Sequence, residues 1–296
     1  MKKYILSSLV AALLPVALFA QESPALPFLR IDRSAITSAM GGAEALSSLY
    51  NPAAIPFRGS DIAVSYQGWA PGGAKSTNLN LLGGIRAGKR IGIHFLGAYQ
   101  QGQEYTLYDN TGNGKTTFDP SDLMVGAGVG FAFTDFLSFG LNVKFAQSTL
   151  APETSISAIS GDAFVMFSRK GFNATVGVAS LGTPVKSGNA SFGLPTSAKV
   201  GVGYDAKFGT SGVFVTADAD VFFTGGVGAA LGAQYAWNDM VFVRAGFHLG
   251  TGQCPLPTYA SVGLGGKFLG IHIDVSYLLA SKALGNTLCV GLGYAF

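Results

Sequence analysis

Alternation between large apolar residues and small or polar residues dominates the chain from Asp61 onward, in segments of about ten residues. The segment 137–147 reads LSFGLNVKFAQ, with an apolar side chain at every second position, and 90–100 and 122–134 follow the same pattern. Successive side chains on a β-strand point to opposite faces, so each segment predicts a strand with one apolar face. Repeated in this way, the pattern is typical of a transmembrane β-barrel that is apolar outside and polar inside.

The pattern predicts fourteen such strands. They cover residues 61–69, 76–86, 90–100, 122–134, 137–147, 157–168, 171–180, 196–205, 211–222, 226–237, 240–249, 258–268, 271–280 and 286–296. Connections after even-numbered strands are short, whereas most of those after odd-numbered strands are longer, led by 101–121 and 181–195. Short periplasmic turns and longer external loops are the topology of outer-membrane barrels. We therefore predict an all-β fold, a transmembrane antiparallel barrel over residues 61–296, with both termini in the periplasm.

Composition agrees with a membrane-embedded wall. Only 12% of the residues are charged, about half of the usual share, and 48% are hydrophobic. This apolar, aromatic composition excludes a disordered chain, and a net charge of +3 argues against a nucleic-acid partner. A secreted β-sandwich is the alternative, but outward aromatic residues gather at one end of the predicted strands, as they do at a membrane interface.

The first twenty residues have the features of a secretory signal peptide. Lys2 and Lys3 form a basic start, 4–18 is apolar, and Ala20 precedes a plausible cleavage point. We predict residues 1–20 as the signal peptide of an exported protein, located in the outer membrane of a diderm bacterium. Outer-membrane lipid and the barrel assembly machinery are then its expected partners.

Residues 21–60 lack the alternation and predict a separate, partly helical segment. The stretch 34–49 has helix-compatible spacing interrupted at Gly41-Gly42, and Asn51-Pro52 ends any helix before the first strand. Fourteen strands enclose more space than their own side chains fill, so this segment can enter the lumen as a hatch. Glycine runs such as Gly126, Gly128 and Gly130 predict places where the wall curves or the hatch approaches.

The hatch segment resembles the start of a known family. Pro27-Phe28-Leu29-Arg30-Ile31, Met40-Gly41-Gly42-Ala43 and Tyr50-Asn51-Pro52-Ala53-Ala54 are similar to the entry segment of the PorV/PorQ family of Bacteroidetes. The Asn-Pro-Ala element also recurs in the wider FadL-like barrels. The resemblance implies a fourteen-stranded barrel with an N-terminal hatch. The PorV/PorQ branch implies type IX protein secretion, and the FadL branch implies uptake of hydrophobic molecules.

Polar residues at inward positions are candidates for a lumen site. By parity they are His94, Lys144, Asp162, Lys199, Asp218, Asp220, Arg244, His248, His272 and Asp274. They predict a charged conduit, a network that holds the hatch through Arg30, Asp32, Arg33 and Glu44, or simply the charges of a polar lumen. A metal site would need the three histidines at one height, which strand counting disfavours. No cofactor is expected.

Three further features concern the cysteines, the C-terminus and catalysis. In an oxidising compartment Cys254 and Cys289 can form a disulfide that pins a loop to the rim, or they can remain free thiols. The alternation that ends in Tyr294 and Phe296 resembles the assembly signal of outer-membrane barrels. No catalytic arrangement of side chains emerges, so we expect no enzyme.

Three hypotheses of function remain open. The first is a PorV/PorQ-type barrel that acts in type IX secretion or surface attachment by binding partners. The second is a FadL-like channel for uptake of small hydrophobic molecules. The third is a structural barrel whose loops engage another membrane protein. Apolar residues along the lumen would favour transport, and an apolar patch on the external rim would favour partner binding.

Overall fold

The structure is a computed structural model that describes residues 24–69, 75–108, 116–152, 154–187, 190–252, 254–280 and 285–296. The predicted signal peptide lies outside the described residues. No helix among them is long and apolar enough to cross a membrane.

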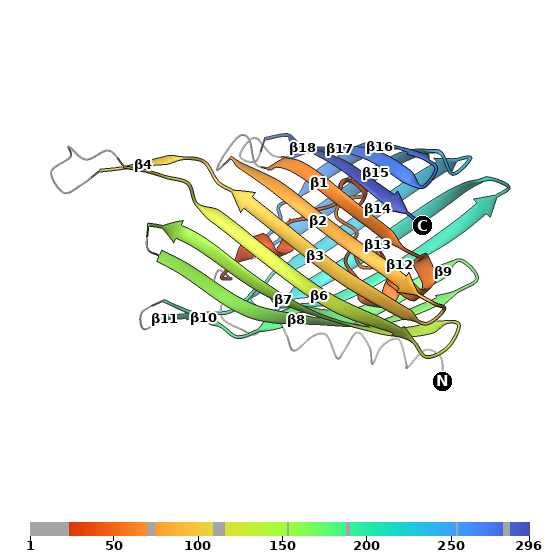
Figure 1. Cartoon of the computed structure of the whole chain (residues 1–296), viewed down its shortest axis with the longest axis horizontal. Coiled ribbons are helices and arrows are strands. Elements are labelled where there is room, and N and C mark those ends of the chain that lie inside the picture. Colours follow the sequence, from red (N-terminus) through yellow and green to blue (C-terminus); the bar gives the residue numbers. More distant parts are fainter. Residues whose placement is uncertain are drawn as a thin grey trace.

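Fourteen antiparallel strands form one closed barrel, as predicted (Figure 1). They are β1 (Asp61–Trp69), β2 (Ser76–Ala87), β3 (Ile91–Gln101), β6 (Ser121–Ala132), β7 (Leu137–Ala151), β8 (Thr154–Arg169), β9 (Phe172–Gly182), β12 (Ser197–Phe208), β13 (Ser211–Phe222), β14 (Val227–Trp237), β15 (Val241–Thr251), β16 (Tyr259–Phe268), β17 (Ile271–Leu279) and β18 (Thr287–Ala295). Each strand pairs with its neighbours in the chain order, and β1 pairs with β18 from Asp61 opposite Ala295 to Gly68 opposite Leu288. Closure leaves the barrel sheet without an unpaired edge, and a sheet can span a lipid bilayer only when its backbone polar groups are all paired.

The two ends of the barrel differ. At the short-turn end, tight connections such as Gly88–Arg90 and Lys170-Gly171 join the strands, and β1 begins and β18 ends there. At the opposite, long-loop end, two hairpins extend from the connections: β4 (Tyr105–Leu107) with β5 (Thr116–Phe118), and β10 (Val185–Ser187) with β11 (Ala190–Phe192). The first of these projects well beyond the wall (Figure 1).

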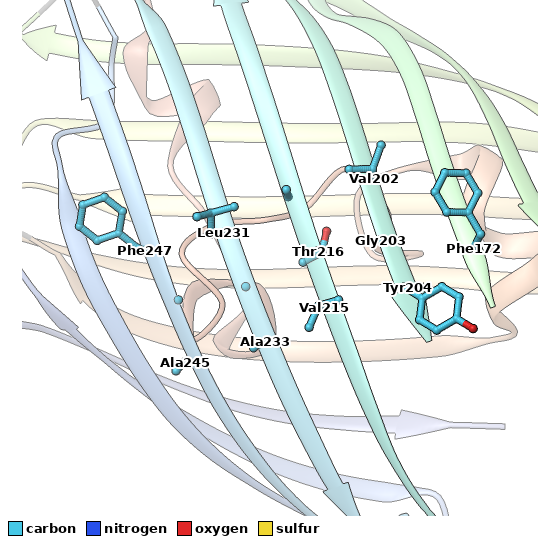
Figure 2. Close-up of a pocket in the computed structure, with 13 residues that line it drawn as sticks. Phe172, Val202, Gly203, Tyr204, Val215, Thr216, Leu231, Ala233, Ala245 and Phe247 are labelled. Atoms are coloured by element: carbon cyan, nitrogen blue, oxygen red, sulfur yellow. The ribbon is translucent and has the colours of Figure 1, made fainter. Parts of the chain in front are cut away.

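Burial alternates along the strands in the predicted phase. Along β17, Ile271, Ile273 and Val275 are exposed on the outer face, whereas His272 and Asp274 are buried inside. Figure 2 shows the outer face of β9 and β12–β15, with Val202, Leu231 and Phe247 among its side chains. An apolar outer face is what hydrocarbon requires, because a charge there costs about 2–4 kcal/mol at mid-depth.

The hatch, residues 24–60, runs inside the barrel from the long-loop end to the short-turn end (Figure 1). Its short elements are η2 (Pro27–Arg30), α2 (Ala35–Ser38), η3 (Pro52–Ala54) and α3 (Ile55–Arg58). The helix expected in 34–49 is confined to α2, because Gly41 and Gly42 adopt positive φ of 71° and 76° and turn the chain. The described part of the hatch therefore enters the barrel at the long-loop end, and β18 finishes at the short-turn end.

Inward glycines of the wall provide the surfaces on which the hatch lies. A β-carbon at Gly130 or Gly140 would collide with the Pro52-Ala53 backbone, and one at Gly246 would collide with Met40 and Gly41. The wall is therefore reduced to backbone where the hatch presses against it, and Gly130 has the close-approach role that the sequence suggested for it.

Candidate functional site

An apolar cavity of about 570 Å³ opens at the long-loop end of the barrel. We call it the mouth cavity. The start of the hatch forms its floor through Leu26, Phe28 and Ile31, and Trp69, Leu150, Ile156, Val185 and Phe192 contribute apolar walls. Gln100, Asp122, Ser148 and Thr154 are its polar members. This volume and this mixture of many apolar and few polar groups are typical of sites for small molecules.

Local contacts fix the floor of the mouth cavity. The amide of Ala25 donates to the carbonyl of Gly193 over 2.8 Å, which ties the hatch to the connection between β11 and β12. Leu26 then adopts a left-handed conformation, and Pro27 starts the 3₁₀ turn η2. Phe28 and Leu29 are thereby buried. The floor is thus the first turn of the hatch.

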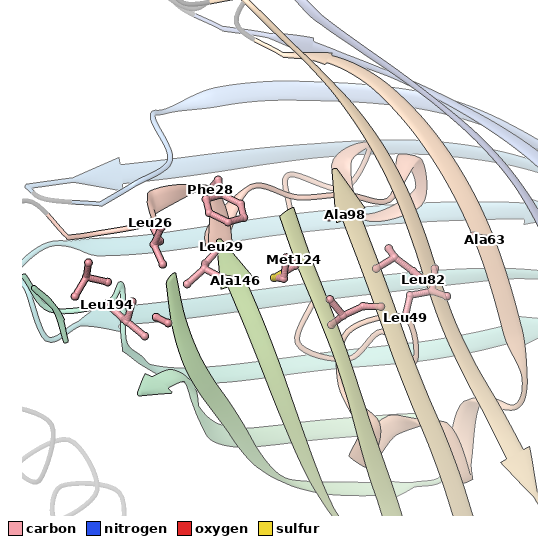
Figure 3. Close-up of a cluster of buried hydrophobic side chains, with 13 residues drawn as sticks. Leu26, Phe28, Leu29, Leu49, Ala63, Leu82, Ala98, Met124, Ala146 and Leu194 are labelled. Atoms are coloured by element: carbon pink, nitrogen blue, oxygen red, sulfur yellow. The ribbon is translucent and has the colours of Figure 1, made fainter. Parts of the chain in front are cut away.

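Below this floor, apolar side chains continue into the lumen (Figure 3). Leu26, Phe28, Leu29 and Leu49 of the hatch pack against inward residues of β2, β3, β6 and β7. The wall residues include Leu82, Leu96, Met124 and Ala146. A polar lumen would not supply leucine and methionine here, so one side of the barrel interior is apolar from the mouth cavity inward.

The hatch closes this apolar side before it reaches the short-turn end. The next cavity inward, between Leu82, Leu96 and Met124 and the charged residues Arg30 and Lys144, measures only about 40 Å³. That is room for about one water molecule. Passage of any larger molecule therefore requires the hatch to move.

A buried ionic network holds the opposite side of the hatch to the wall. Arg30 lies 3.1 Å from Asp220 and 3.5 Å from Glu44, and Lys199 lies 2.7 Å from Glu44 and 3.2 Å from Asp220. Asp218 accepts a hydrogen bond of 2.7 Å from the amide of Ala45. Burial alone would raise the pKa of Glu44, but Lys199 and Arg30 hold it below its ordinary value. These ion pairs join Arg30 and Glu44 of the hatch to Lys199 and Asp220 of the wall.

Asp32 and Arg33 differ from Arg30 and Glu44, because their side chains bond within the hatch. Asp32 accepts hydrogen bonds from Thr37 Oγ1 and Tyr50 OH, both at 2.6 Å, and from the Ser34 amide at 3.1 Å. Arg33 donates to the carbonyls of Phe28 and Ile31. Their charges therefore shape the hatch fold, and only the carbonyl of Arg33 reaches the wall, where it accepts from Ser65.

The other motif residues of the hatch are placed at contacts with the wall. The Gly41 amide donates to Ser261 Oγ over 2.9 Å, and Gly42 passes beside Tyr259. Asn51 accepts from the Ala53 amide and donates to the Ala45 carbonyl and to Thr175 Oγ1. It therefore caps η3, whose first residue is Pro52.

The remaining inward polar residues pair among themselves. Lys144 binds Asp162 at 2.7 Å. Near the short-turn end a chain of contacts runs from Gln234 through Arg244, Asp274 and His272 to Asp61, with each link between 2.6 and 2.9 Å. This chain joins β14, β15, β17 and β1 across the barrel seam.

The histidines each have a separate partner. His94 contacts the Leu49 carbonyl, His248 contacts the Gly41 carbonyl, and His272 contacts two aspartates. In the described part of the chain, no group of three or more His, Cys, Asp or Glu residues is placed to hold a metal ion.

Cys254 and Cys289 are both free thiols, so the suggested disulfide is not formed. Cys289 points inward from β18 in the register of Gln67 and Ser276. Cys254 packs near Gly228 and Gly250 on β14 and β15. Two strands, β16 and β17, separate those positions from β18, so the loop holds its thiol away from Cys289.

Apart from the motif Pro27-Phe28-Leu29-Arg30-Ile31, the sequence did not single out the residues of the mouth cavity. Trp69 and Phe192 end β1 and β11, and Ile156 lies near the start of β8, so these residues are far apart in the chain. Apolar residues at such positions look like ordinary residues at strand ends. The available signal was the apolar character of Pro27–Ile31 in a segment expected to enter a polar lumen.

No family model and no curated protein sequence matches the chain. Solved structures do resemble it. The toluene transporter TbuX of Ralstonia pickettii superposes with a TM-score of 0.61 at 12% identity, covering 89% of this chain and 98% of that one. The toluene transporter TodX of Pseudomonas putida gives 0.62 at 13% identity, covering 88% and 97%. The monoaromatic hydrocarbon channel CymD gives 0.62 at 13% identity, covering 90% and 98%. At this identity the likeness concerns the fold: the chain has the architecture of a bacterial outer-membrane channel.

Proposed function

We propose that this protein is an outer-membrane channel for uptake of small hydrophobic molecules, with its long-loop end outside the cell and its short-turn end in the periplasm. The mouth cavity carries the proposal. It is apolar, large enough for a small molecule and continuous with the apolar side of the lumen. The similar structures are transporters of toluene and channels for monoaromatic hydrocarbons, which supports this reading and suggests toluene as a probe.

The geometry suggests how such uptake would proceed. A hydrophobic molecule leaves water for the mouth cavity because burial of apolar surface is favourable. It then meets Phe28 and Leu29 of the hatch, with the ionic network of Arg30, Glu44, Lys199 and Asp220 behind them. Movement of the hatch away from Leu82, Leu96 and Met124 would open the apolar side toward the periplasm.

Toluene binding can be measured through Trp69, which lines the mouth cavity. The second tryptophan, Trp237, lies at the far end of β14, so Trp237→Phe leaves a single reporter in the site. We expect a saturable change in Trp69 emission as toluene is added. Ile156→Asp should weaken binding about tenfold or more, because it places a charge against an apolar ligand.

The matched control is Thr106→Asp, which adds the same charge on the β4–β5 hairpin. Trp69→Phe, which retains Trp237, reports effects of toluene on the bulk membrane. Cells that produce the parent protein should also accumulate toluene faster than cells that produce Ile156→Asp. An unsaturable response at Trp69, or equal binding by Ile156→Asp, would count against the channel.

A PorV/PorQ-type role in type IX secretion is the second candidate, and one observation favours it. Tyr105, Leu107 and Tyr108 are exposed on and beside the β4–β5 hairpin, which projects beyond the wall. Exposed apolar side chains outside the lipid belt are typical of partner contacts. Secretion components should co-purify with the parent protein from outer membranes and be lost with Tyr105→Ser/Leu107→Ser. Equal co-purification, or none with either protein, would remove this candidate.

A further inference from the structure

Three polar residues of the mouth cavity stand side by side on one of its walls. Gln100 of β3 pairs with Asp122 of β6, and Asp122 pairs with Ser148 of β7. Residues paired in this way have their β-carbons about 4.5–5.5 Å apart on the same face of a sheet. All three line the cavity. They therefore form one continuous row, which we call the polar row, with Asp122 at its centre.

Asp122 brings a carboxylate without a matching cation into this row. It is partly buried. Within the part of the chain that the structure describes, the ion pairs all involve other carboxylates. A carboxylate only accepts hydrogen bonds, and its two oxygens offer about four lone-pair sites. Asp122 therefore has accepting capacity for a ligand that donates a hydrogen bond.

Aromatic side chains supply other parts of the cavity lining. Phe28 belongs to the floor (Figure 3), Trp69 ends β1, and Phe192 ends β11. Aromatic rings attract one another in offset-stacked and edge-to-face arrangements, beyond the gain from burying their surface. The cavity thus combines walls suited to an aromatic ring with one strong hydrogen-bond acceptor.

The charges around the cavity favour a neutral donor over a charged one. Arg33 donates to the carbonyls of Phe28 and Ile31, so its guanidinium lies against the floor, and Arg30 lines the next cavity inward. These cations would repel an ammonium ligand on its way in, because charges interact strongly where water is excluded. A carboxylate ligand would be repelled by Asp122 itself. A hydroxyl group meets neither repulsion.

We propose that the mouth cavity selects phenols, single aromatic rings with a hydroxyl group, over the corresponding hydrocarbons. The hydroxyl donates to the Asp122 carboxylate while the ring packs against Phe28, Trp69 and Phe192. A phenol is neutral at pH 7, since its pKa is about 10, and a hydrogen bond to an ionised acceptor is stronger than one between neutral groups. A hydrocarbon displaces water from Asp122 and leaves it without a donor. This inference rests on the proposed channel function and specifies its substrate class.

Equilibrium dialysis of radiolabelled ligands against the full chain in neutral detergent at pH 7 tests the preference. Toluene and p-cresol differ only by one hydroxyl group, so their comparison isolates its contribution. Detergent micelles dissolve both ligands, and only the saturable part counts as binding to the protein. The parent protein should bind p-cresol about tenfold more tightly than toluene. It should bind 4-methylbenzylamine, which carries an ammonium group instead, more weakly than p-cresol.

Asp122→Leu removes the acceptor and keeps a side chain of similar length. This variant should lose the preference for p-cresol while its toluene binding is retained or becomes tighter, and retained toluene binding shows that the cavity is intact. Asp119→Leu is the matched control, since Asp119 lies in the loop before β6, bonds Gln101 and is exposed outside the cavity lining. It should bind both ligands as the parent does. Heat-dependent gel migration verifies that each variant is a folded barrel.

Three outcomes would overturn the inference and leave the channel standing. They are saturable toluene binding with no gain for p-cresol, an unchanged preference for p-cresol in Asp122→Leu, and tighter binding of the amine than of p-cresol. Absence of saturable binding for both toluene and p-cresol would instead remove the proposed channel together with its substrate class.

Discussion

Asp32 is a carboxylic acid enclosed by the hatch itself. Burial disfavours its charged form and Glu44 repels it, so the pKa of Asp32 is raised to about 6 despite three hydrogen bonds to the carboxyl group. These bonds all reach Oδ1, and Oδ2 has no hydrogen-bond partner among the described residues. A proton on Oδ2 therefore fits the site.

We predict that the hatch loosens at Asp32 as the pH rises. The folded pKa lies above the ordinary value of 3.8, so the contribution of Asp32 is full below about pH 4 and is lost as the pH rises through about 6. Asp32→Asn imitates the protonated acid. Ionic leak through single barrels in planar bilayers should increase between pH 4 and 7 in the parent relative to Asp32→Asn.

Glu44 provides the internal contrast for that measurement. Its pKa is lowered, so its contribution is present above its ordinary value of 4.5 and is lost as the pH falls. The difference between the parent and Asp32→Asn isolates the Asp32 effect from this opposing one. A difference that does not depend on pH would contradict the assignment.

Lys199 is the residue whose loss should release the hatch most directly. It is buried between Glu44 and Asp220, so Lys199→Met leaves these two carboxylates with Arg30 as their remaining cation, at a cost of about 3–5 kcal/mol. We expect a marked rise in leak through the barrel. Lys267→Met breaks the exposed pair with Asp239, worth about 0–1 kcal/mol, and should leave the leak unchanged. A closed Lys199→Met barrel would show that the network does not hold the hatch.

At the scale of elements, η3 and α3 form the part of the hatch nearest the short-turn end. Asn51 caps η3, Ser138 Oγ donates to the Ala53 carbonyl over 2.6 Å, and Gly130 and Gly140 admit the backbone at Pro52-Ala53. Few side-chain bonds are involved. The fit depends mainly on the absence of side chains in the wall.

Gly130→Val should therefore displace η3. The new side chain would collide with the Pro52 carbonyl, while valine itself suits a strand. Proteolysis of the hatch in an otherwise folded barrel, followed by mass spectrometry, should become faster. Gly97→Val is the control, since a β-carbon at Gly97 has no neighbour within 4 Å. Equal protection of both variants would show that η3 tolerates the larger wall.

At the scale of the whole molecule, the barrel closes between its first and last strands. Tyr294 and Phe296 are exposed on the outer face, with ring centroids 5.5 Å apart, and the Phe296 amide donates to the Ser60 carbonyl. The last strand thus carries both the seam and the predicted assembly signal.

Removal of the Phe296 ring should lower assembly more than it lowers stability. We expect Phe296→Ala to reduce the amount of folded barrel in outer membranes several-fold, while the barrel that does form melts as the parent does. Phe268→Ala removes another exposed aromatic residue at the short-turn end and serves as the control. Equal yields of the two variants would argue against a special role for Phe296.

Strand positions and side-chain direction were predictable, because both depend on local alternation. His272 and Asp274 point inward and Ile273 points outward through the two-residue period alone. Strand boundaries differ from the prediction where no local signal exists. β7 extends to Ala151, past its predicted end at 147, and β8 begins at Thr154, before its predicted start at 157. The reason is that pairing between the two strands continues past the lipid-facing part. The hatch was predictable as a segment without alternation, but its route through the barrel was not.

The sequence by itself determined that this chain closes a fourteen-stranded barrel in lipid. Each strand has its own two-residue alternation, and in membrane hydrocarbon only a closed sheet pairs all of its backbone polar groups. Only the tertiary structure decided what each inward residue meets. Arg30 and Asp220 lie 190 positions apart and form an ion pair, whereas the neighbouring Arg33 binds carbonyls of its own segment. The mouth cavity likewise depends on loops meeting the hatch across the barrel. Partners across a lumen are set by shear, closure and the path of the hatch, and no local pattern in the chain encodes these.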